Sequence, residues 1–259
     1  MTNMEIGICA HPSDAPELSP EAFDYFEVNV QSFLVPEKEE SAFQPHLNAA
    51  TSAIKPVKSA NCLLPGDLKC VGPNLDHQRL LRYAQNAFSR AERIGIEVVV
   101  FGSGGSRSVP DGYSQDQALQ DFVEVLRQFG SIAQRYGVTL VVEPLNKTEC
   151  NFINSLAEGA EAVEQCNHPN VRLLADSYHM DKDAEPVSEI VRFGHLLRHV
   201  HVAELAGRCF PGKSGEDFRP FFQMLQQIGY AGRVSLECTW NDIVTDHVFS
   251  TRYLRGQMS

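Results

Sequence analysis

The feature that most constrains the fold is a series of four short apolar runs, each of which ends in an acidic residue or a histidine. The runs cover residues 138–143, 171–176, 197–201 and 234–237, and their last residues lie 33, 25 and 36 positions apart. One strand followed by one helix occupies about 30 residues of chain. The spacing therefore indicates a strand-and-helix unit that is repeated along the second half of the sequence.

Four similar runs in the first half, at residues 5–9, 25–30, 57–63 and 96–101, bring the total to eight. Continuous apolar runs are typical of parallel strands whose sheet is covered on both faces. A closed barrel of eight strand-and-helix units typically takes about 250 residues, and this chain has 259. We therefore predict an α/β fold, a single (β/α)8 barrel that occupies residues 1–259 as one domain.

Helix patterns lie between the predicted strands. Apolar residues at helical spacing occur around residues 80–94, 119–133 and 218–225. Ser114 and Ser155 each precede a Gln or Glu by three positions, which is the pattern of a helix-starting capping box. Gly95, Gly137 and Gly229 fall where these helices should end. The proline-rich first third of the chain leaves the first two helices poorly defined.

Composition argues against several classes of partner. Acidic residues outnumber basic ones 33 to 22, which gives a net charge of −11 and disfavours binding to nucleic acid. No stretch approaches the roughly 20 apolar residues of a membrane span, and the N-terminus has no pattern of a secretion signal. Seven cysteines without a C-x-x-C pair favour a reducing cytoplasm. Whether several copies associate into a homo-oligomer stays open.

The residues that end the four runs predict a metal site. In a closed parallel barrel the carboxyl ends of all strands meet at one mouth, so Glu143, Asp176, His201 and Glu237 should converge there. Three carboxylates with one imidazole favour a single divalent ion, with Mn²⁺ first and Mg²⁺, Co²⁺ or Zn²⁺ as alternatives. His199 faces the same way as His201, but His201 is nearer the mouth and is the better ligand. For Asp176 the alternative role is to cap the following helix.

Two carboxylates at such a mouth suit chemistry on sugars. A divalent ion that binds two adjacent oxygens of a ketose stabilises the enediolate formed when a proton leaves. Glu143 and Glu237 can then each act as acid or base on one face of the substrate. Residues 101–107, which contain Gly102, Gly104 and Gly105, are predicted to form a tight turn near the ligand.

Five segments in order carry a resemblance to a known family. They are residues 141–146, 174–180, 199–204, 207–212 and 229–237. Together they resemble the xylose-isomerase-like TIM-barrel superfamily, which holds sugar isomerases and epimerases, inosose dehydratases and endonuclease IV. Within it, the chain is similar to ketose 3-epimerases and to hydroxypyruvate isomerase.

The resemblance implies the same four metal ligands and the same acid/base pair, Glu143 and Glu237. It also implies three substrate contacts, at Glu149, His179 and Arg208. For the last two, the alternatives are an ordinary loop histidine and a surface arginine. No family substrate motif is visible around His11, Glu27 and Asn61, so the sequence does not identify the sugar.

Taken together, the residues and the resemblance predict a divalent-metal-dependent isomerase or epimerase of a small ketose or a related polyhydroxy carbonyl compound. The alternative is a metal-dependent dehydratase that acts on a keto-inositol or keto-sugar with the same ligands. A repair nuclease on this scaffold needs a multinuclear zinc site with more histidines and a basic face, which the charge and the strand ends of this chain do not provide.

Overall fold

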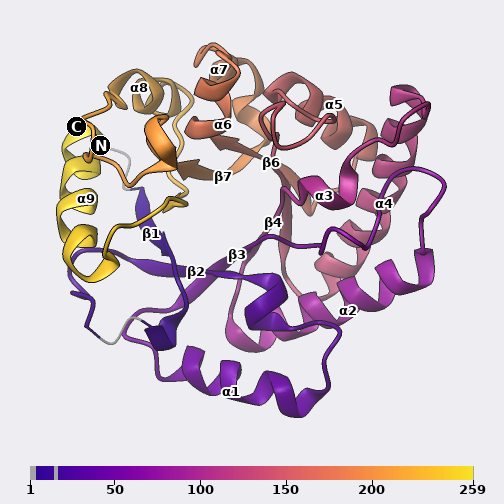
Figure 1. Cartoon of the computed structure of the whole chain (residues 1–259), viewed down its shortest axis with the longest axis horizontal. Coiled ribbons are helices and arrows are strands. Elements are labelled where there is room, and N and C mark those ends of the chain that lie inside the picture. The colour runs from indigo at the N-terminus through magenta and orange to yellow at the C-terminus, as the bar shows by residue number, and fades with distance from the viewer. Residues whose placement is uncertain (1–3, 15–16, 259) are drawn as a thin grey trace.

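The computed structural model describes residues 4–14 and 17–258. Its eight parallel strands close into a barrel in chain order, and the helices lie around the outside (Figure 1). The predicted (β/α)8 barrel is therefore confirmed, and each of the eight predicted apolar runs overlaps a strand. The strands are β1 (Glu5–Cys9), β2 (Tyr25–Asn29), β3 (Val57–Asn61), β4 (Val98–Phe101), β5 (Thr139–Val142), β6 (Val171–Asp176), β7 (Leu197–Val202) and β8 (Arg233–Leu236).

The helices vary in length more than the strands do. The α-helices are α1 (Glu40–Thr51), α2 (His77–Ile94), α3 (Gly104–Arg107), α4 (Gln115–Arg135), α5 (Leu156–Cys166), α6 (Ser177–Lys182), α7 (Glu189–Phe193), α8 (Arg219–Gln227) and α9 (Ile243–Gln257). The described residues also form 3₁₀ and π-helical turns, which are η1 (Pro12–Asp14), η2 (Val30–Leu34), η3 (Gly194–Leu196) and η4 (Ala206–Arg208). Within the described ranges, no helix is both long enough and apolar enough to cross a membrane.

The expectation that each candidate ligand ends its strand is wrong by one residue at three positions. β5 ends at Val142 and β8 at Leu236, so Glu143 and Glu237 are the first residues beyond their strands. β7 continues past His201 to Val202. After Glu143, Pro144 has no N–H with which to extend the ladder. The side chains at these positions still project into the same mouth.

The predicted helix ends are confirmed where the structure tests them. The hydroxyls of Ser114 and Ser155 accept hydrogen bonds from the backbone N–H groups of Gln117 and Glu158 and so cap α4 and α5. The Glu158 carboxylate accepts from the N–H of Asn154 instead of Ser155, so this capping box is displaced by one residue. Gly95 ends α2 with a φ of 92°, a conformation that glycine adopts without strain.

The first third of the chain is irregular, as its prolines indicate. In the described residues between β1 and β2 the helical structure is the single turn η1. β2 runs directly into η2, a π-helical turn, and α1 follows with Pro45 in its interior. Proline removes one backbone hydrogen bond from a helix and strains the preceding turn. This part of the barrel wall is therefore built from loops and short turns as well as from helix.

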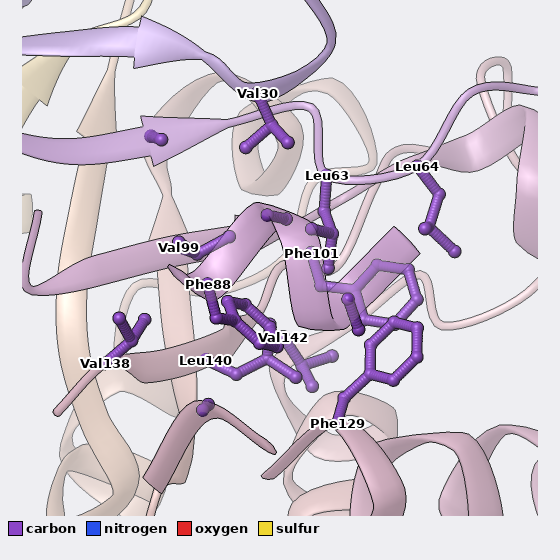
Figure 2. Close-up of a cluster of buried hydrophobic side chains, with 14 of the residues drawn as sticks. Val30, Leu63, Leu64, Phe88, Val99, Phe101, Phe129, Val138, Leu140 and Val142 are labelled. Carbon is purple, nitrogen blue, oxygen red and sulfur yellow. The ribbon is translucent and has the colours of Figure 1, made fainter. Parts of the chain in front are cut away.

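The largest hydrophobic cluster lies between the strands and the surrounding helices. Figure 2 shows Phe88 of α2 and Phe129 of α4 against Phe101 of β4. The rings of Phe101 and Phe129 stack with centroids 5.9 Å apart. All three side chains are fully buried, and an aromatic side chain removes 150–250 Å² from water when it is buried. The cluster anchors α2 and α4 on the outside of the barrel.

The inside of the barrel is divided into an apolar side and a polar side. Val98, Val100, Val141 and Leu174 form a small cluster contributed by β4, β5 and β6. On the opposite side, β2, β3, β7 and β8 contribute buried polar groups, which are Tyr25, Glu27, Ser59, His199, His201 and Ser235. Since buried polar groups need partners, this second side requires a connected network, and that network lies under the mouth.

Candidate metal and substrate site

Four side chains from the last four strand units converge at the mouth of the barrel. One ligand atom from each of Glu143, Asp176, His201 and Glu237 lies within 4.8 Å of the other three. The side chains of Asp176 and His201 are 2% and 0% exposed, whereas that of Glu237 is 17% exposed. The four residues that the sequence predicted as ligands are therefore brought together in a buried group that opens toward solvent at one side.

His201 is the centre of this group. Its Nδ1 lies 3.0 Å from Oε1 of Glu143, 3.5 Å from Oε2 of Glu237 and 3.8 Å from Oδ2 of Asp176. Although burial opposes the charged ring, Glu27, Glu237 and Glu143 together hold the pKa of His201 well above its usual value. The ring therefore presents one nitrogen to three carboxylates.

Asp176 caps a helix, and its position leaves the predicted role as a metal ligand open to it as well. Its Oδ1 accepts hydrogen bonds from the backbone N–H groups of Tyr178, at 2.7 Å, and His179, at 3.3 Å, and so caps α6. Its Oδ2 points to the mouth and lies 3.8 Å from Nδ1 of His201. The cap fixes the carboxylate, and the second oxygen remains available as a ligand.

The carboxylates at the mouth repel one another. Burial, followed by the charge of Glu237, raises the pKa of Glu143. Burial also disfavours the charged form of Glu237, but His201 and Arg208 lower its pKa to about 2. A buried set of oxygen ligands with excess negative charge and one imidazole matches the preferences of a hard divalent cation. The residues present thus fit the ion that the sequence predicted.

Arg208 and Glu149 border the same group of carboxylates. Arg208 forms a close ion pair with Glu237, and its guanidinium lies 3.9 Å from Asp176 and 3.6 Å from Glu149. The ring of Tyr178 stacks under this guanidinium at 4.8 Å. Arg208 is therefore held by contacts on several sides and is not the freely exposed arginine that was the alternative.

His179 is buried with one nitrogen engaged and one free. Its Nδ1 accepts a hydrogen bond from the backbone N–H of Asn146 at 3.2 Å. An imidazole nitrogen that accepts carries no proton, so the neutral ring has its proton on Nε2. That Nε2 lies 3.8 Å from Oδ2 of Asp176 and has no hydrogen-bond partner among the described residues. A buried donor without a partner at the mouth can serve a substrate oxygen.

The glycine-rich segment after β4 lies directly under one of the carboxylates. It forms a short helix, α3, which begins after Ser103. A Cβ atom placed on Gly102 would lie 2.1 Å from Oε2 of Glu143, so any other residue here would have to displace that carboxylate. The predicted turn therefore lies against a candidate ligand, and glycine at residue 102 leaves room for the carboxylate of Glu143.

The sequence reasoning missed the support beneath the mouth. Glu27 of β2 accepts hydrogen bonds from Nε2 of both His199 and His201, at 2.7 and 2.8 Å. Asn61 of β3 donates to Oε1 of Glu237 at 2.8 Å. The available signal was a glutamate within the strand-like run 25–30, because an acid in a buried strand requires a partner.

Comparisons with known proteins agree with the barrel fold. The family described as "Xylose isomerase-like TIM barrel" matches residues 22–252. The D-psicose 3-epimerase of Ruminiclostridium cellulolyticum is 33% identical over 116 residues, which are 44% of this chain and 39% of that protein. In this alignment the chain spans less than half the length of its relative.

Two solved structures resemble the whole chain. A D-allulose 3-epimerase from Methylomonas sp. superposes with a TM-score of 0.84 over 99% of each chain at 18% identity. The IOLI protein with a bound zinc atom superposes with a TM-score of 0.74, at 16% identity, over 98% of this chain and 96% of that one. At these identities the two structures establish the shared fold.

Proposed function

Because this chain belongs to the xylose isomerase-like TIM barrel family, we propose that it is a divalent-metal-dependent epimerase or isomerase of small ketoses or related polyhydroxy carbonyl compounds. The observation that carries the proposal is the convergence of Glu143, Asp176, His201 and Glu237 on one point at the mouth. The similarity to a D-psicose 3-epimerase supports the same class of substrate.

The four converging side chains are the proposed ligands of one ion, with Mn²⁺ as the first candidate. A divalent ion bound there would polarise the carbonyl of the substrate and stabilise the negative charge that develops during proton removal. The similarity in fold to the IOLI protein with a bound zinc atom supports the binding of a metal by this chain. Zn²⁺, Mg²⁺ and Co²⁺ are the alternatives to be tested against Mn²⁺.

Glu143 and Glu237 are the proposed acid/base pair. They follow β5 and β8, so they approach the mouth from separate sides of the barrel. In an epimerisation, one carboxylate removes the proton from the carbon that changes configuration, and the other returns a proton to the opposite face. General bases of this kind contribute about 10²- to 10⁴-fold to the rate.

The remaining polar groups are proposed to hold the substrate. The Nε2–H of His179 would donate to a substrate oxygen, because it is buried at the mouth without a partner among the described residues. Arg208 offers several donors in a fixed plane for hydroxyl groups. Glu149, 3.6 Å from Arg208, is the third proposed substrate contact.

A cavity beside the mouth offers room for the rest of the substrate. It has a volume of about 250 Å³, and its lining includes Cys9, His11, Asn29, Asn61 and Cys62, at and beyond the carboxyl ends of β1, β2 and β3. Neither lysine nor arginine is among the residues that line it. We therefore propose that the substrate is not phosphorylated at the end that enters this cavity.

Proton exchange tests this function directly. The Mn²⁺-loaded protein is incubated in D₂O with a panel of free ketoses, phosphorylated ketoses and keto-inositols, and the products are followed by NMR. Deuterium entry at the carbon next to the carbonyl, with interconversion of two free sugars, is the expected result. Loss of water from the substrate would instead indicate the dehydratase, and activity only on phosphorylated sugars would contradict the assignment of the cavity.

All seven cysteines of the chain are free thiols. Since free thiols persist in reducing compartments, we propose that the protein acts in the cytoplasm. Fractionation of the source cells with an antibody against the chain tests this location.

A further inference from the structure

A buried carboxylate lies beneath the mouth without belonging to the proposed ligand set. Glu27 of β2 is 1% exposed and stands at the centre of the polar side of the barrel. It reaches across the interior to β7, although 172 residues separate it from His199 along the chain. Burying a carboxylate is costly unless several donors satisfy it, so its position calls for a specific explanation.

The two oxygens of Glu27 have different surroundings. Oε2 is held by three groups, the hydroxyl of Ser59 at 2.7 Å, that of Ser235 at 2.6 Å and Nε2 of His199 at 2.7 Å. Oε1 lies 2.8 Å from Nε2 of His201. Because the three contacts on Oε2 fix the rotation of the carboxylate, Oε1 is aimed at a single ring nitrogen.

This contact determines how the ring of His201 faces the mouth. The proton of the contact with Glu27 must come from Nε2, because a carboxylate can only accept. The other nitrogen, Nδ1, is then left to the carboxylates of Glu143, Asp176 and Glu237. A half-turn of the ring would place carbon atoms against both Glu27 and Glu143, so both contacts oppose it.

A second metal ion held by Glu27, His199 and His201 is the competing interpretation, because one candidate ligand atom from each lies within 4.8 Å of the other two. The hydrogen bonds indicate that shared protons, and not a metal cation, link Glu27 to the two histidines. Oε2 of Glu27 already accepts from two hydroxyls and an imidazole, and the side chains of Glu27 and both histidines are fully buried. The group is a connected polar layer inside the barrel.

We propose that Glu27 is a positioning residue for metal binding, which holds His201 with the proton on Nε2 and Nδ1 directed at the ion. This inference rests on the proposed function, since it assumes that His201 is a ligand. Carboxylates that orient a metal-bound histidine in this way commonly change metal affinity 10- to 100-fold when they are removed.

The first test is a titration of the metal-free protein with Mn²⁺, in which free Mn²⁺ is followed by electron paramagnetic resonance. E27Q keeps the shape of the side chain and removes its charge, and we expect it to bind one Mn²⁺ about 10- to 100-fold more weakly than the wild type. E97Q is the matched control, since Glu97 lies just before β4 at the other end of the barrel, and its affinity should stay within about twofold. Thermal unfolding in the presence of EDTA reports whether each variant is folded.

The second test uses the wild-type protein and so does not depend on a variant that folds. Histidines labelled with ¹⁵N are observed by NMR with Zn²⁺ as a diamagnetic probe, and the signals of His201 are assigned from an H201Q variant. We expect a proton on Nε2 and a metal shift on Nδ1. Metal bound through Nε2, or two ions bound per chain, would overturn the inference.

The outcomes separate this inference from the proposed function. If the wild type binds Mn²⁺ and D176N weakens binding while E27Q does not, the metal site stands and the role of Glu27 is wrong. If the wild type itself binds no Mn²⁺, the proposed metal site and the role of Glu27 fail together.

Discussion

The two ends of the barrel hold carboxylates in opposite electrostatic settings. At the amino ends of the strands, Glu97 contacts Lys58 at 2.7 Å and Arg233 at 2.8 Å, and Arg233 also contacts Glu5 at 2.9 Å. Each acid there has a base within contact distance. At the carboxyl ends, Glu143, Asp176, Glu237 and Glu149 share Arg208 and His201, so negative charge is in excess.

This difference indicates what each end does. Balanced ion pairs at the bottom of a barrel close the sheet and contribute to stability, whereas residues at the top carry the chemistry. Charge that the protein itself does not neutralise costs stability unless something binds there. The carboxyl end of the strands, the unbalanced end, is therefore where a cation and a substrate are expected. The amino end, the balanced end, offers residues whose substitution serves as a control for substitutions at the mouth.

The largest expected effect is a loss of turnover when either of the two proposed acid/base glutamates at the unbalanced end is replaced. E143Q and E237Q each keep an oxygen ligand but cannot take a proton, so we expect each to retain Mn²⁺, with weaker affinity, and to lose at least about 10² in turnover. Deuterium exchange and sugar interconversion measure the loss. If one variant keeps near-normal turnover while the other is inactive, a two-base epimerase is excluded and a one-base isomerase or a dehydratase becomes the better explanation.

A methyl group added at Gly102 tests whether the loop after β4 fixes the position of the Glu143 carboxylate. The added Cβ would lie 2.1 Å from Oε2 of Glu143, so G102A must displace that carboxylate. A displacement of about 1 Å at a reacting group can lower a rate by up to about 10²-fold, and we expect a drop of at least about tenfold. G66A is the control, because its Cβ would make an ordinary contact at 3.8 Å with Gly105. Equal turnover in both variants would show that Glu143 is not held against this loop.

A third prediction concerns an acid near the mouth that lies outside the metal group. Burial, followed by the charges of Glu189 and Glu158, raises the pKa of Glu185 from 4.5 to about 7. Folding therefore favours the protonated form, and the contribution of this group to stability is greatest below pH 4.5 and is lost as the pH rises through about 7. E185Q is neutral at every pH, so at pH 8 it should be more stable than the wild type by about 1–2 kcal/mol.

Denaturant unfolding of both proteins at pH 4 and pH 8 measures this effect. The difference between E185Q and the wild type should be small at pH 4, because below 4.5 the glutamate is largely protonated in the unfolded state as well as in the folded one. The Gln side-chain oxygen can still accept from the N–H of Leu156, which Glu185 holds at 2.8 Å. A constant difference across the two pH values would contradict the raised pKa.

The smallest expected effect is at the balanced end. E97Q removes the negative partner of Lys58 and Arg233, but the side chain of Glu97 is 42% exposed. Ion pairs with this exposure contribute about 0–1 kcal/mol, so the free energy of unfolding should fall by less than about 1 kcal/mol. Turnover should be unchanged, and a large loss of turnover would mean that the two ends of the barrel are not separate in function.

Much of the barrel could be predicted because its signals are local in sequence. Each strand is a short apolar run, and helices such as α2 and α4 show their buried face every three to four residues. The candidate ligands could be chosen because each lies at the end of a run, within one residue of the strand end in the structure. Asp176 was predicted as a ligand, with a helix cap as the alternative, and in the structure one oxygen caps α6 while the other lies toward His201.

The sequence by itself determined the repeat of strands and helices, the polar residue at the end of each late strand, and the excess of negative charge. Only the tertiary structure decided how these residues face one another. Glu27 reaches His201 across 174 positions of chain, and Gly102 makes room for Glu143. Such contacts arise when the sheet closes on itself, because closure brings strands that are distant in sequence to face each other across one interior.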